Sequence, residues 1–325
     1  VPSLLRGFST PVKLEFPYTR EELAFLMSHD TDGFNRWDAG QQLAVQVLCD
    51  GIAAYDIGNP IAADPLLLRA FKRLLQDTSL DQAMVARLCE LPSEQYLAEI
   101  LPKPTNVDGI HHAREHLKRG LAMALQPLLQ ETWYRTRVEG PYRYADEDVA
   151  RRSLHNVCLS YLMTLEDDDV TQLCLRQYHN ATNMTEQLAA LRTLVHSNRS
   201  EKQAVIDDFY QRWQREALVV DQWFTVQATA PQADTLNRAE SLLQHPAFEI
   251  TNPNKVRALV GSFCNGNPVN FHRADGEGYR FLADRIIQLN ALNPQIASRM
   301  STLMTRWRNY DEQRAAHIRA QLQRI

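Results

Sequence analysis

The feature that most constrains this chain is a long stretch, from Tyr142 to Ala230, that contains neither glycine nor proline. Since these two residues interrupt regular structure most strongly, their absence over such a length favours helices joined by short polar turns. Apolar side chains recur along the stretch at helical spacing, first at Leu188, Leu191, Leu194 and Val195 and then at Val205, Phe209, Trp213 and Leu218. This periodicity predicts an all-helical fold.

Capping residues place the starts of several helices. Asp64-Pro65, Asn252-Pro253 and Asn293-Pro294 each put a capping side chain before a proline in the first helical position. Four further starts are predicted from capping side chains alone: Thr19, which forms a capping-box pattern with Glu22, and Asp146, Asn183 and Ser200.

The first 17 residues have a different texture. They hold three of the fifteen prolines, and apolar and charged residues alternate over residues 12–16. We expect an extended connector over residues 1–17, with a strand that closes a preceding β domain, followed by a helical domain over residues 18–325. The chain begins with Val1 and not with methionine, so we expect a piece of a longer polypeptide.

A chain of 325 residues exceeds the usual size of a single core, which leaves two domains or an extended array of repeats. Helices of roughly 12 to 18 residues with short loops are typical of antiparallel helix pairs. We therefore predict a right-handed superhelix, an α-solenoid of HEAT- or armadillo-like pairs without a sharp internal repeat. A compact helical bundle is the structural alternative.

Composition bears on partners and location. The formal net charge is −4, without the basic surplus that nucleic acid binding requires, so no nucleic acid partner is expected. No stretch approaches the roughly 18 apolar residues of a membrane span, so no membrane partner is expected. The five cysteines lie in apolar runs without C-x-x-C spacing: Cys49, Cys89, Cys158, Cys174 and Cys264. They are interpreted as free thiols of a cytoplasmic protein.

His112, Glu115 and His116 form an H-x-x-E-H string, the pattern of inverted zinc peptidases. On a helix the two imidazoles would share a face and could converge on a metal, with the glutamate as base. Positive charge around the string and the lack of a third ligand favour a solvated helix flank. The buried stripe is instead assigned to Ile110, Ala113, Leu117, Leu121, Ala124 and Leu128. We expect no metal ligand and no catalytic residue in this chain.

Other candidate sites are interpreted structurally. The acidic run from Glu166 to Asp169 lacks the alternation and glycine of a calcium loop and is interpreted as a hydrated loop. The aromatic residues Phe209, Tyr210, Trp213, Trp223 and Phe224 are interpreted as packing. H-E-x-x-H, G-x-S-x-G, the P-loop and G-x-G-x-x-G are absent from the sequence.

Two Asn-Pro helix starts carry an arginine about one turn inside, Arg257 and Arg299. Between them, the segment from Gly261 to Gly278 holds four of the twelve glycines, along with Asn265, Asn267, Asn270 and His272. We interpret this segment as a shaped polar loop that is presented to a ligand. The alternative is that both arginines solvate exposed helix starts.

Several ordered segments carry a resemblance to a known family: residues 1–9 with 11–14, 34–39, 183–185, 218–224 and the two Asn-Pro segments. Together they resemble the C-terminal domain of bacterial aminopeptidase N, one of the H-E-x-x-H zinc aminopeptidases. The resemblance covers essentially the whole chain. It implies a four-domain enzyme with an N-terminal β domain, a thermolysin-like catalytic domain, a small β domain and this helical superhelix.

The resemblance also implies a role. In the family a zinc-bound water attacks the scissile carbonyl of a peptide with a glutamate as base, and that zinc site belongs to the catalytic domain. The helical domain closes over the catalytic domain of the same polypeptide to form a chamber for short peptides, so this chain is expected to be inactive alone. Arg257 and Arg299 match arginines that face the chamber, and we hypothesise that they bind a peptide's C-terminal carboxylate. The alternative is an independent α-solenoid that binds a protein partner.

Overall fold

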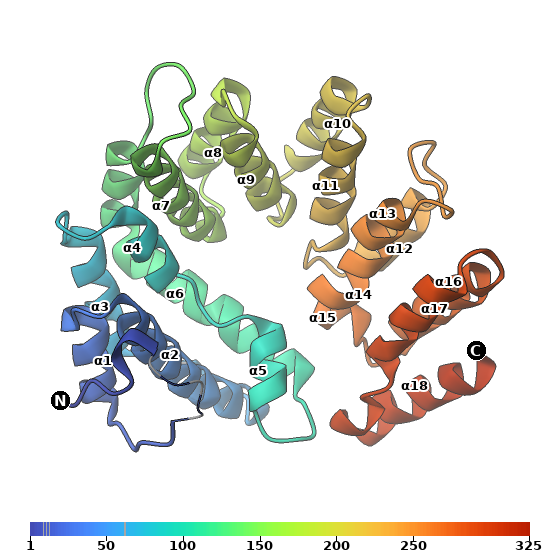
Figure 1. Cartoon of the computed structure of the whole chain (residues 1–325), viewed down its shortest axis with the longest axis horizontal. Coiled ribbons are helices and arrows are strands. Elements are labelled where there is room, and N and C mark those ends of the chain that lie inside the picture. Colours follow the sequence, from blue (N-terminus) through green and yellow to red (C-terminus); the bar gives the residue numbers. More distant parts are fainter. Residues whose placement is uncertain (9, 11, 13, 62) are drawn as a thin grey trace. The chain divides into compact units, whose positions relative to one another are not determined.

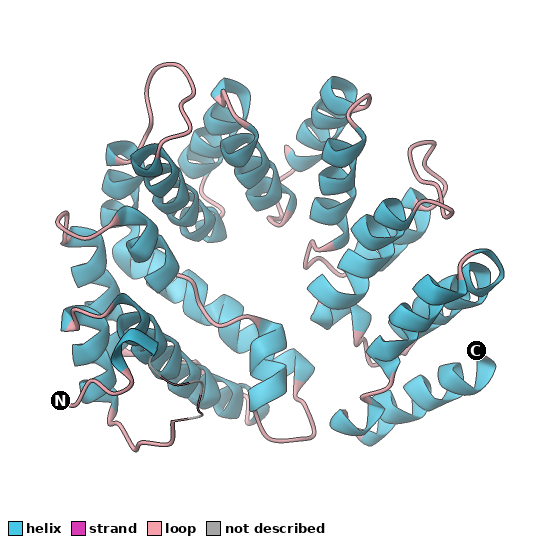
Figure 2. Ribbon diagram, viewed as in Figure 1, coloured by secondary structure: helices cyan, strands magenta, loops and turns pink. Residues whose placement is uncertain are grey.

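The computed structural model describes residues 1–8, 10, 12, 14–61 and 63–325. Within these residues every regular element is a helix, which confirms the all-helical prediction (Figures 1 and 2). The chain divides into two compact units, Val1–Ser93 with Gly109–Ala190, and Glu94–Asp108 with Leu191–Ile325. The expectation of one helical domain over residues 18–325 stays a prediction.

The described residues of the first unit form six complete α-helices: α1 (Arg20–His29), α2 (Gly33–Asp56), α3 (Pro65–Gln76), α4 (Gln82–Leu88), α7 (Asp146–Leu162) and α8 (Asp168–Asn180). Two 3-10 turns accompany them, η1 (Arg6–Phe8) and η2 (Met163–Leu165). Two helices are divided between the units, the long α6 (Val107–Arg135) and the shorter α9 (Met184–Val195). Within the first unit, α1 packs against α2 and α3, and α4 packs against α7.

Helix α3 illustrates why these sequences form packed helices. Its apolar residues recur every three or four positions, so one stripe of the helix is buried: Leu67, Ala70, Phe71, Leu74 and Leu75. The ring of Phe71 meets Tyr161 of α7 edge to face, with centroids 6.1 Å apart. Burial of such a stripe, at roughly 25 cal/mol per Å², supplies the main stabilisation of a helix this short.

The second unit contains the remaining helices. They are α5 (Glu94–Ile100), α10 (Lys202–Trp213), α11 (Ala217–Ala228), α12 (Thr235–Leu242), α13 (Pro253–Val256), α14 (Ser262–Gly266), α15 (Pro268–Phe271), α16 (Glu277–Leu292), α17 (Pro294–Ser301) and α18 (Glu312–Arg324). A π-helical turn, η3 (Arg257–Gly261), and two 3-10 turns, η4 (Thr302–Met304) and η5 (Trp307–Asn309), complete the unit. Helix α11 packs against α10, α12, η3 and α14, and α16 packs against α17 and α18.

Most predicted helix starts are confirmed. Asp64, Asn252 and Asn293 each accept a hydrogen bond from a first-turn N–H, with proline in the first position. Thr19 and Glu22 form the predicted capping box, and Asn183 accepts from the N–H of Glu186. These caps depend only on residues within one turn, which is why sequence reveals them.

Two predicted caps are wrong. Asp146 is the first residue of α7 and not its cap, where Ala145 stands without a side-chain hydrogen bond. Helix α10 begins at Lys202, and the hydroxyl of Ser200 donates to Glu201 instead of capping the helix. In α7 the three acidic residues of the first turn stabilise the helix start through its dipole, so a capping side chain is less needed.

The lengths of the described helices depart from the predicted range, from four residues in α13 to 29 in α6. The stripe predicted for α6 is correct as far as Leu121 and then shifts by one residue. Ala124 is exposed and Leu128 is half-buried, whereas Leu125 and Leu129 are buried. In the pairs Ala124-Leu125 and Leu128-Leu129 both residues are apolar, so the sequence allows either residue of a pair to face the core. Packing against the neighbouring helices determines which one is buried.

The predicted connector has little regular structure in its described part. Among residues 1–8, 10, 12 and 14–17 the one regular element is η1, so the expected strand is absent from them. Ser9, Pro11 and Lys13 of the quoted motifs lie outside the described residues. Arg6 connects the beginning of the chain to the residue that follows α1, because its guanidinium donates to Asp30 at 2.9 Å.

The five cysteines are free, as predicted, and all but the half-buried Cys49 are buried. Burial raises the pKa of Cys174 to about 12, so this thiol stays protonated at neutral pH. Within the part of the chain that the structure describes, no helix combines the length and apolar character needed to cross a bilayer.

Candidate functional site

Arg257 is exposed and begins the π-helical turn η3 in the second unit. Its guanidinium Nη1 donates a hydrogen bond of 2.8 Å to Oδ1 of Asn254, one turn earlier. Asn254 is itself fixed, since its backbone N–H donates to the capping side chain of Asn252 at 2.9 Å. The Asn-Pro start therefore orients one edge of the guanidinium and leaves its other donors for a ligand.

The residue two positions earlier points inward. Lys255 is buried, and its Nζ lies 2.7 Å from Oδ1 of Asp221 in α11. Nζ also donates to the carbonyl of Ala217 at 3.0 Å and lies 5.7 Å from the ring centroid of Phe224. This buried ion pair fixes the short helix α13 on α11, so Arg257 projects from an anchored element.

The π-helical turn is a feature that sequence reasoning missed. The N–H of Ser262 donates to the carbonyl of Arg257, five residues back, and the Ser262 hydroxyl contacts the same oxygen at 3.3 Å. From α11, the hydroxyl of Thr225 donates to the carbonyl of Ala258 at 3.1 Å. Turns of this kind are rare and frequently occur at functional sites.

Arg299 is also exposed and lies near the end of α17, after the predicted Asn293-Pro294 start. Within the described residues its guanidinium has neither a hydrogen bond nor an ion pair, and the hydrogen bond that Thr302 donates goes to the backbone carbonyl of Arg299. The structure thus places both predicted arginines on exposed helical positions of the second unit. Their joint binding of a carboxylate stays a prediction.

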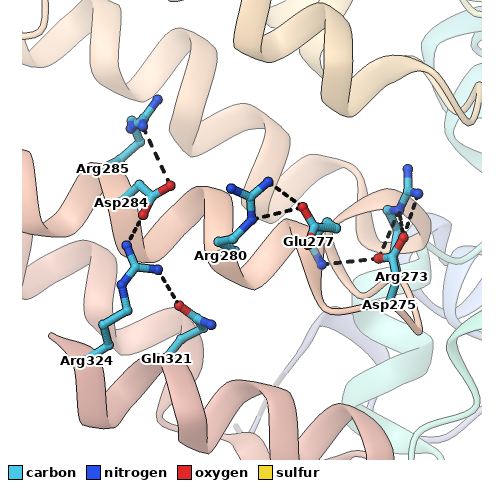
Figure 3. A network of polar contacts seen from close by, with 8 residues as sticks. All are labelled: Arg273, Asp275, Glu277, Arg280, Asp284, Arg285, Gln321 and Arg324. Carbon is cyan, nitrogen blue, oxygen red and sulfur yellow. Dashed lines mark hydrogen bonds and ion pairs between the residues drawn. The ribbon is translucent and has the colours of Figure 1, made fainter.

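Other arginines of the same unit are already paired (Figure 3). Along α16 and α18, Arg280 pairs with Glu277 and Arg324 pairs with Asp284. Just before α16, Arg273 pairs with Asp275 at 2.7 Å and holds the pKa of that carboxyl below its usual value through the hydrogen bond. A carboxylate ligand would have to compete with these side chains, whereas Arg299 has no such competitor among the described residues.

The segment from Gly261 to Gly278 is not the polar loop that the sequence suggested. Much of it is helical, in α14 and α15. Asn267 and Asn270 are buried, and their amide groups donate to backbone carbonyls after the end of α11, with Asn267 2.7 Å from Ala230. A side chain at Gly278 would overlap the carbonyl of Phe271, so glycine here permits a close backbone approach.

His272 also has a structural environment. Its Nδ1 lies 3.0 Å from the hydroxyl of Tyr279, and its Nε2 lies 3.0 Å from the hydroxyl of Tyr310. Burial lowers its pKa to about 3, assisted by the charge of Arg314, which donates to the His272 carbonyl at 2.6 Å. Arg314 also pairs with Asp108 at 2.7 Å. This network connects the end of α15 to α16, to α18 and to the first turn of α6.

The H-x-x-E-H string lies on the flank of α6, as expected. His112 and His116 are exposed, and the His112 ring stacks on Tyr55 with centroids 4.7 Å apart. Glu115 lies 3.3 Å from the guanidinium of its neighbour Arg114. Among the described residues no group of three or more His, Cys, Asp or Glu side chains is placed to hold a metal ion, so zinc does not fit this part of the chain.

The two remaining candidates are structural. Asp167 of the acidic run caps α8, accepting from the N–H groups of Asp169 and Val170. Phe209, Trp223 and Phe224 are buried, as predicted for packing residues.

The chain matches a known protein family whose description agrees with the all-helical fold. Residues 20–325 match the family model described as "Domain of unknown function (DUF3458_C) ARM repeats". The chain therefore belongs to this ARM-repeat family, which confirms the prediction of an α-solenoid.

Three relatives show what the chain is similar to. It is 38% identical to Aminopeptidase N of Escherichia coli and 35% identical to Aminopeptidase N of Haemophilus influenzae, over 100% of this chain and 37% of each relative. A crystal structure of Legionella pneumophila aminopeptidase A in complex with aspartic acid aligns with a TM-score of 0.88 and 33% identity, over 99% of this chain and 38% of that one. The predicted resemblance is confirmed, and the chain spans little more than a third of these relatives.

Proposed function

We propose that this chain is the C-terminal helical domain of a zinc aminopeptidase that removes N-terminal residues from peptides. The observation that carries the proposal is the similarity of the entire chain to about a third of two proteins named Aminopeptidase N. The described residues lack a group that could hold a metal, so we assign zinc and the catalytic residues to the remainder of the polypeptide.

The helical domain closes the active-site chamber over the catalytic domain of the same polypeptide and controls which substrates enter. Short peptides enter, and folded proteins are excluded by size. Exposed arginines suit this role, because a guanidinium recognises a carboxylate through two parallel hydrogen bonds. We assign this recognition to Arg257 and Arg299, with the peptide's C-terminal carboxylate as ligand.

We also propose a compartment for the protein. Five free cysteines, four of them buried, suit a reducing environment, and we place the protein in the cytoplasm.

The experiment measures peptide cleavage and metal content of the complete polypeptide. The polypeptide should release the first residue from peptides with a free amino terminus but not from N-acetylated peptides, and it should lose this activity when a chelator is added. Restoration by stoichiometric zinc completes the expected pattern. A complete polypeptide that binds a protein partner and cleaves no peptide would instead favour the independent scaffold.

A further inference from the structure

We propose that Thr225 is a positioning residue for Arg257, acting through the π-helical turn η3. The inference rests on the proposed function, because it takes Arg257 as a carboxylate-binding residue. It adds that the direction of this guanidinium depends on a hydrogen bond to the π-helical turn, donated by the Thr225 hydroxyl from a different helix.

The contacts form a short chain between the two helices. The Thr225 hydroxyl in α11 donates to the carbonyl of Ala258 at 3.1 Å and lies 3.2 Å from the hydroxyl of Ser262. The Ser262 hydroxyl lies 3.3 Å from the carbonyl of Arg257. Both carbonyls belong to the first two residues of η3.

The two hydroxyl groups carry two protons, so two of these three contacts are hydrogen bonds at any one time. Thr225 donates to the carbonyl of Ala258, and Ser262 donates either to the carbonyl of Arg257 or to Thr225. A π-helical turn contains one more residue than an α-helical turn and disturbs the regular backbone bonds. A hydroxyl that enters the turn from a neighbouring helix supplies a donor for a carbonyl there and stabilises the wider turn.

The side-chain direction depends on this turn. One residue of an α-helix corresponds to about 100° of rotation, so the loss of the extra residue would turn part of the segment by that amount. Lys255 fixes the preceding turn through its ion pair with Asp221. Arg257 lies where the anchored turn and the π-helical turn join, so its orientation responds to both.

The experiment uses conservative variants of the complete polypeptide. Thr225→Val keeps the shape and removes the hydroxyl, and Thr225→Ser keeps the hydroxyl. We expect Thr225→Val to raise KM for tripeptides by about threefold to tenfold, the range for one lost hydrogen bond. The kcat should be unchanged, and so should the kinetics with small chromogenic amides that lack the carboxylate. Thr225→Ser should restore the normal KM.

Two further variants separate positioning from general loss of structure. Thr171→Val removes a comparable hydroxyl, which donates to the Asp167 carbonyl at 2.8 Å in the first unit, and it should leave KM unchanged. In an Arg257→Ala background, Thr225→Val should have no further effect on KM. Hydrogen exchange should show faster exchange of the Ser262 amide in Thr225→Val, independent of activity.

The outcomes distinguish this inference from the proposed function. If Arg257→Ala raises KM and Thr225→Val does not, the positioning role is wrong and the role of Arg257 stands. If Arg257→Ala leaves KM for tripeptides unchanged, both fail, even in a complete polypeptide that is an aminopeptidase. An equal effect of Thr225→Val and Thr225→Ser, or a further effect of Thr225→Val in the Arg257→Ala background, also overturns the inference.

Discussion

Lys255 and Asp221 form an ion pair of 2.7 Å that joins α13 to α11, with side chains that are only 9% and 12% exposed. Asp221→Ala should leave a buried ammonium without its partner and destabilise the second unit by about 3 kcal/mol or more. The double variant Asp221→Leu with Lys255→Met should lose much less, because no charge remains buried. Urea unfolding followed by circular dichroism measures both.

A surface pair provides the control for that prediction. Arg87 and Glu90 lie 2.9 Å apart, but their side chains are 71% and 49% exposed. Arg87→Ala should leave the unfolding midpoint nearly unchanged, because solvent screens such pairs. Equal losses for the single and double variants of the buried pair would show that an unpaired buried charge is not what destabilises the single variant.

The unfolding free energy should fall as the pH is lowered from about 6.5. Burial lowers the pKa of His155 to about 4 and that of His272 to about 3, both below the value of about 6.5 in an unfolded chain. The unfolded state therefore binds more protons between these values. Each histidine contributes stability that is complete above pH 6.5 and is lost at about 1.4 kcal/mol per pH unit as the pH falls.

Single variants can assign this pH dependence to each unit, since His155 lies in the first and His272 in the second. His155→Gln and His272→Gln should each flatten the dependence between pH 6.5 and 5 by about one proton, measured by thermal melts across pH. If the unfolding free energy of the variants and of the original chain changed equally with pH, the lowered pKa values of the two buried histidines would be contradicted.

Two glycine substitutions should have opposite signs. Gly278→Ala forces a methyl group against the backbone carbonyl of Phe271, where no flexible side chain can yield, and should destabilise the chain by about 2 kcal/mol or more. Gly120→Ala adds a methyl group in open space within α6 and should stabilise it by about 0.5 to 1 kcal/mol. Thermal unfolding measures both, and a stabilising Gly278→Ala would refute the close approach of α16 to α15.

The two exposed arginines should affect peptides and small amides differently. Arg257→Ala and Arg299→Ala in the complete polypeptide should each raise KM for tripeptides. The increase should correspond to a loss of roughly 1.5 to 3 kcal/mol of binding free energy from charge-assisted hydrogen bonds that solvent does not screen. Chromogenic amides lack the carboxylate and should be hardly affected. Arg280→Ala is the matched control, because Arg280 is already paired with Glu277 and should not matter for either substrate. Unchanged KM for peptides in both variants would remove the carboxylate-binding hypothesis.

Local signals in the sequence predicted the helices and many of their starts. Asn252 and Asn293 could be identified as caps because the bonds they accept come from within the next turn. The π-helical turn that begins at Arg257 could not be identified in this way, since the hydroxyl that enters it comes from Thr225, 33 positions before Ala258, whose carbonyl accepts its hydrogen bond. The role of Gly278 likewise depends on its close approach to the backbone of Phe271. The sequence does not show this contact, so, from sequence alone, the glycines of the segment are interpreted as a sign of a loop.

The candidate site was predicted only in part. Exposure of Arg257 and Arg299 agrees with the hypothesis, yet it follows from their helical positions and does not identify a ligand. Sequence could not show which basic residues are already neutralised, because that depends on carboxylates such as Asp284, which meets Arg324 of α18 from α16. The proposed zinc site is assigned to the remainder of the polypeptide, so this sequence holds no signal for its ligands.

The most direct test is an assay of the purified 325-residue chain beside the complete polypeptide, with the same peptides and with and without a metal chelator. The account predicts chelator-sensitive release of N-terminal residues by the complete polypeptide and none by the 325-residue chain. Sustained peptide cleavage by the isolated chain that a chelator abolishes would contradict the account, because it would place a working metal centre among these helices.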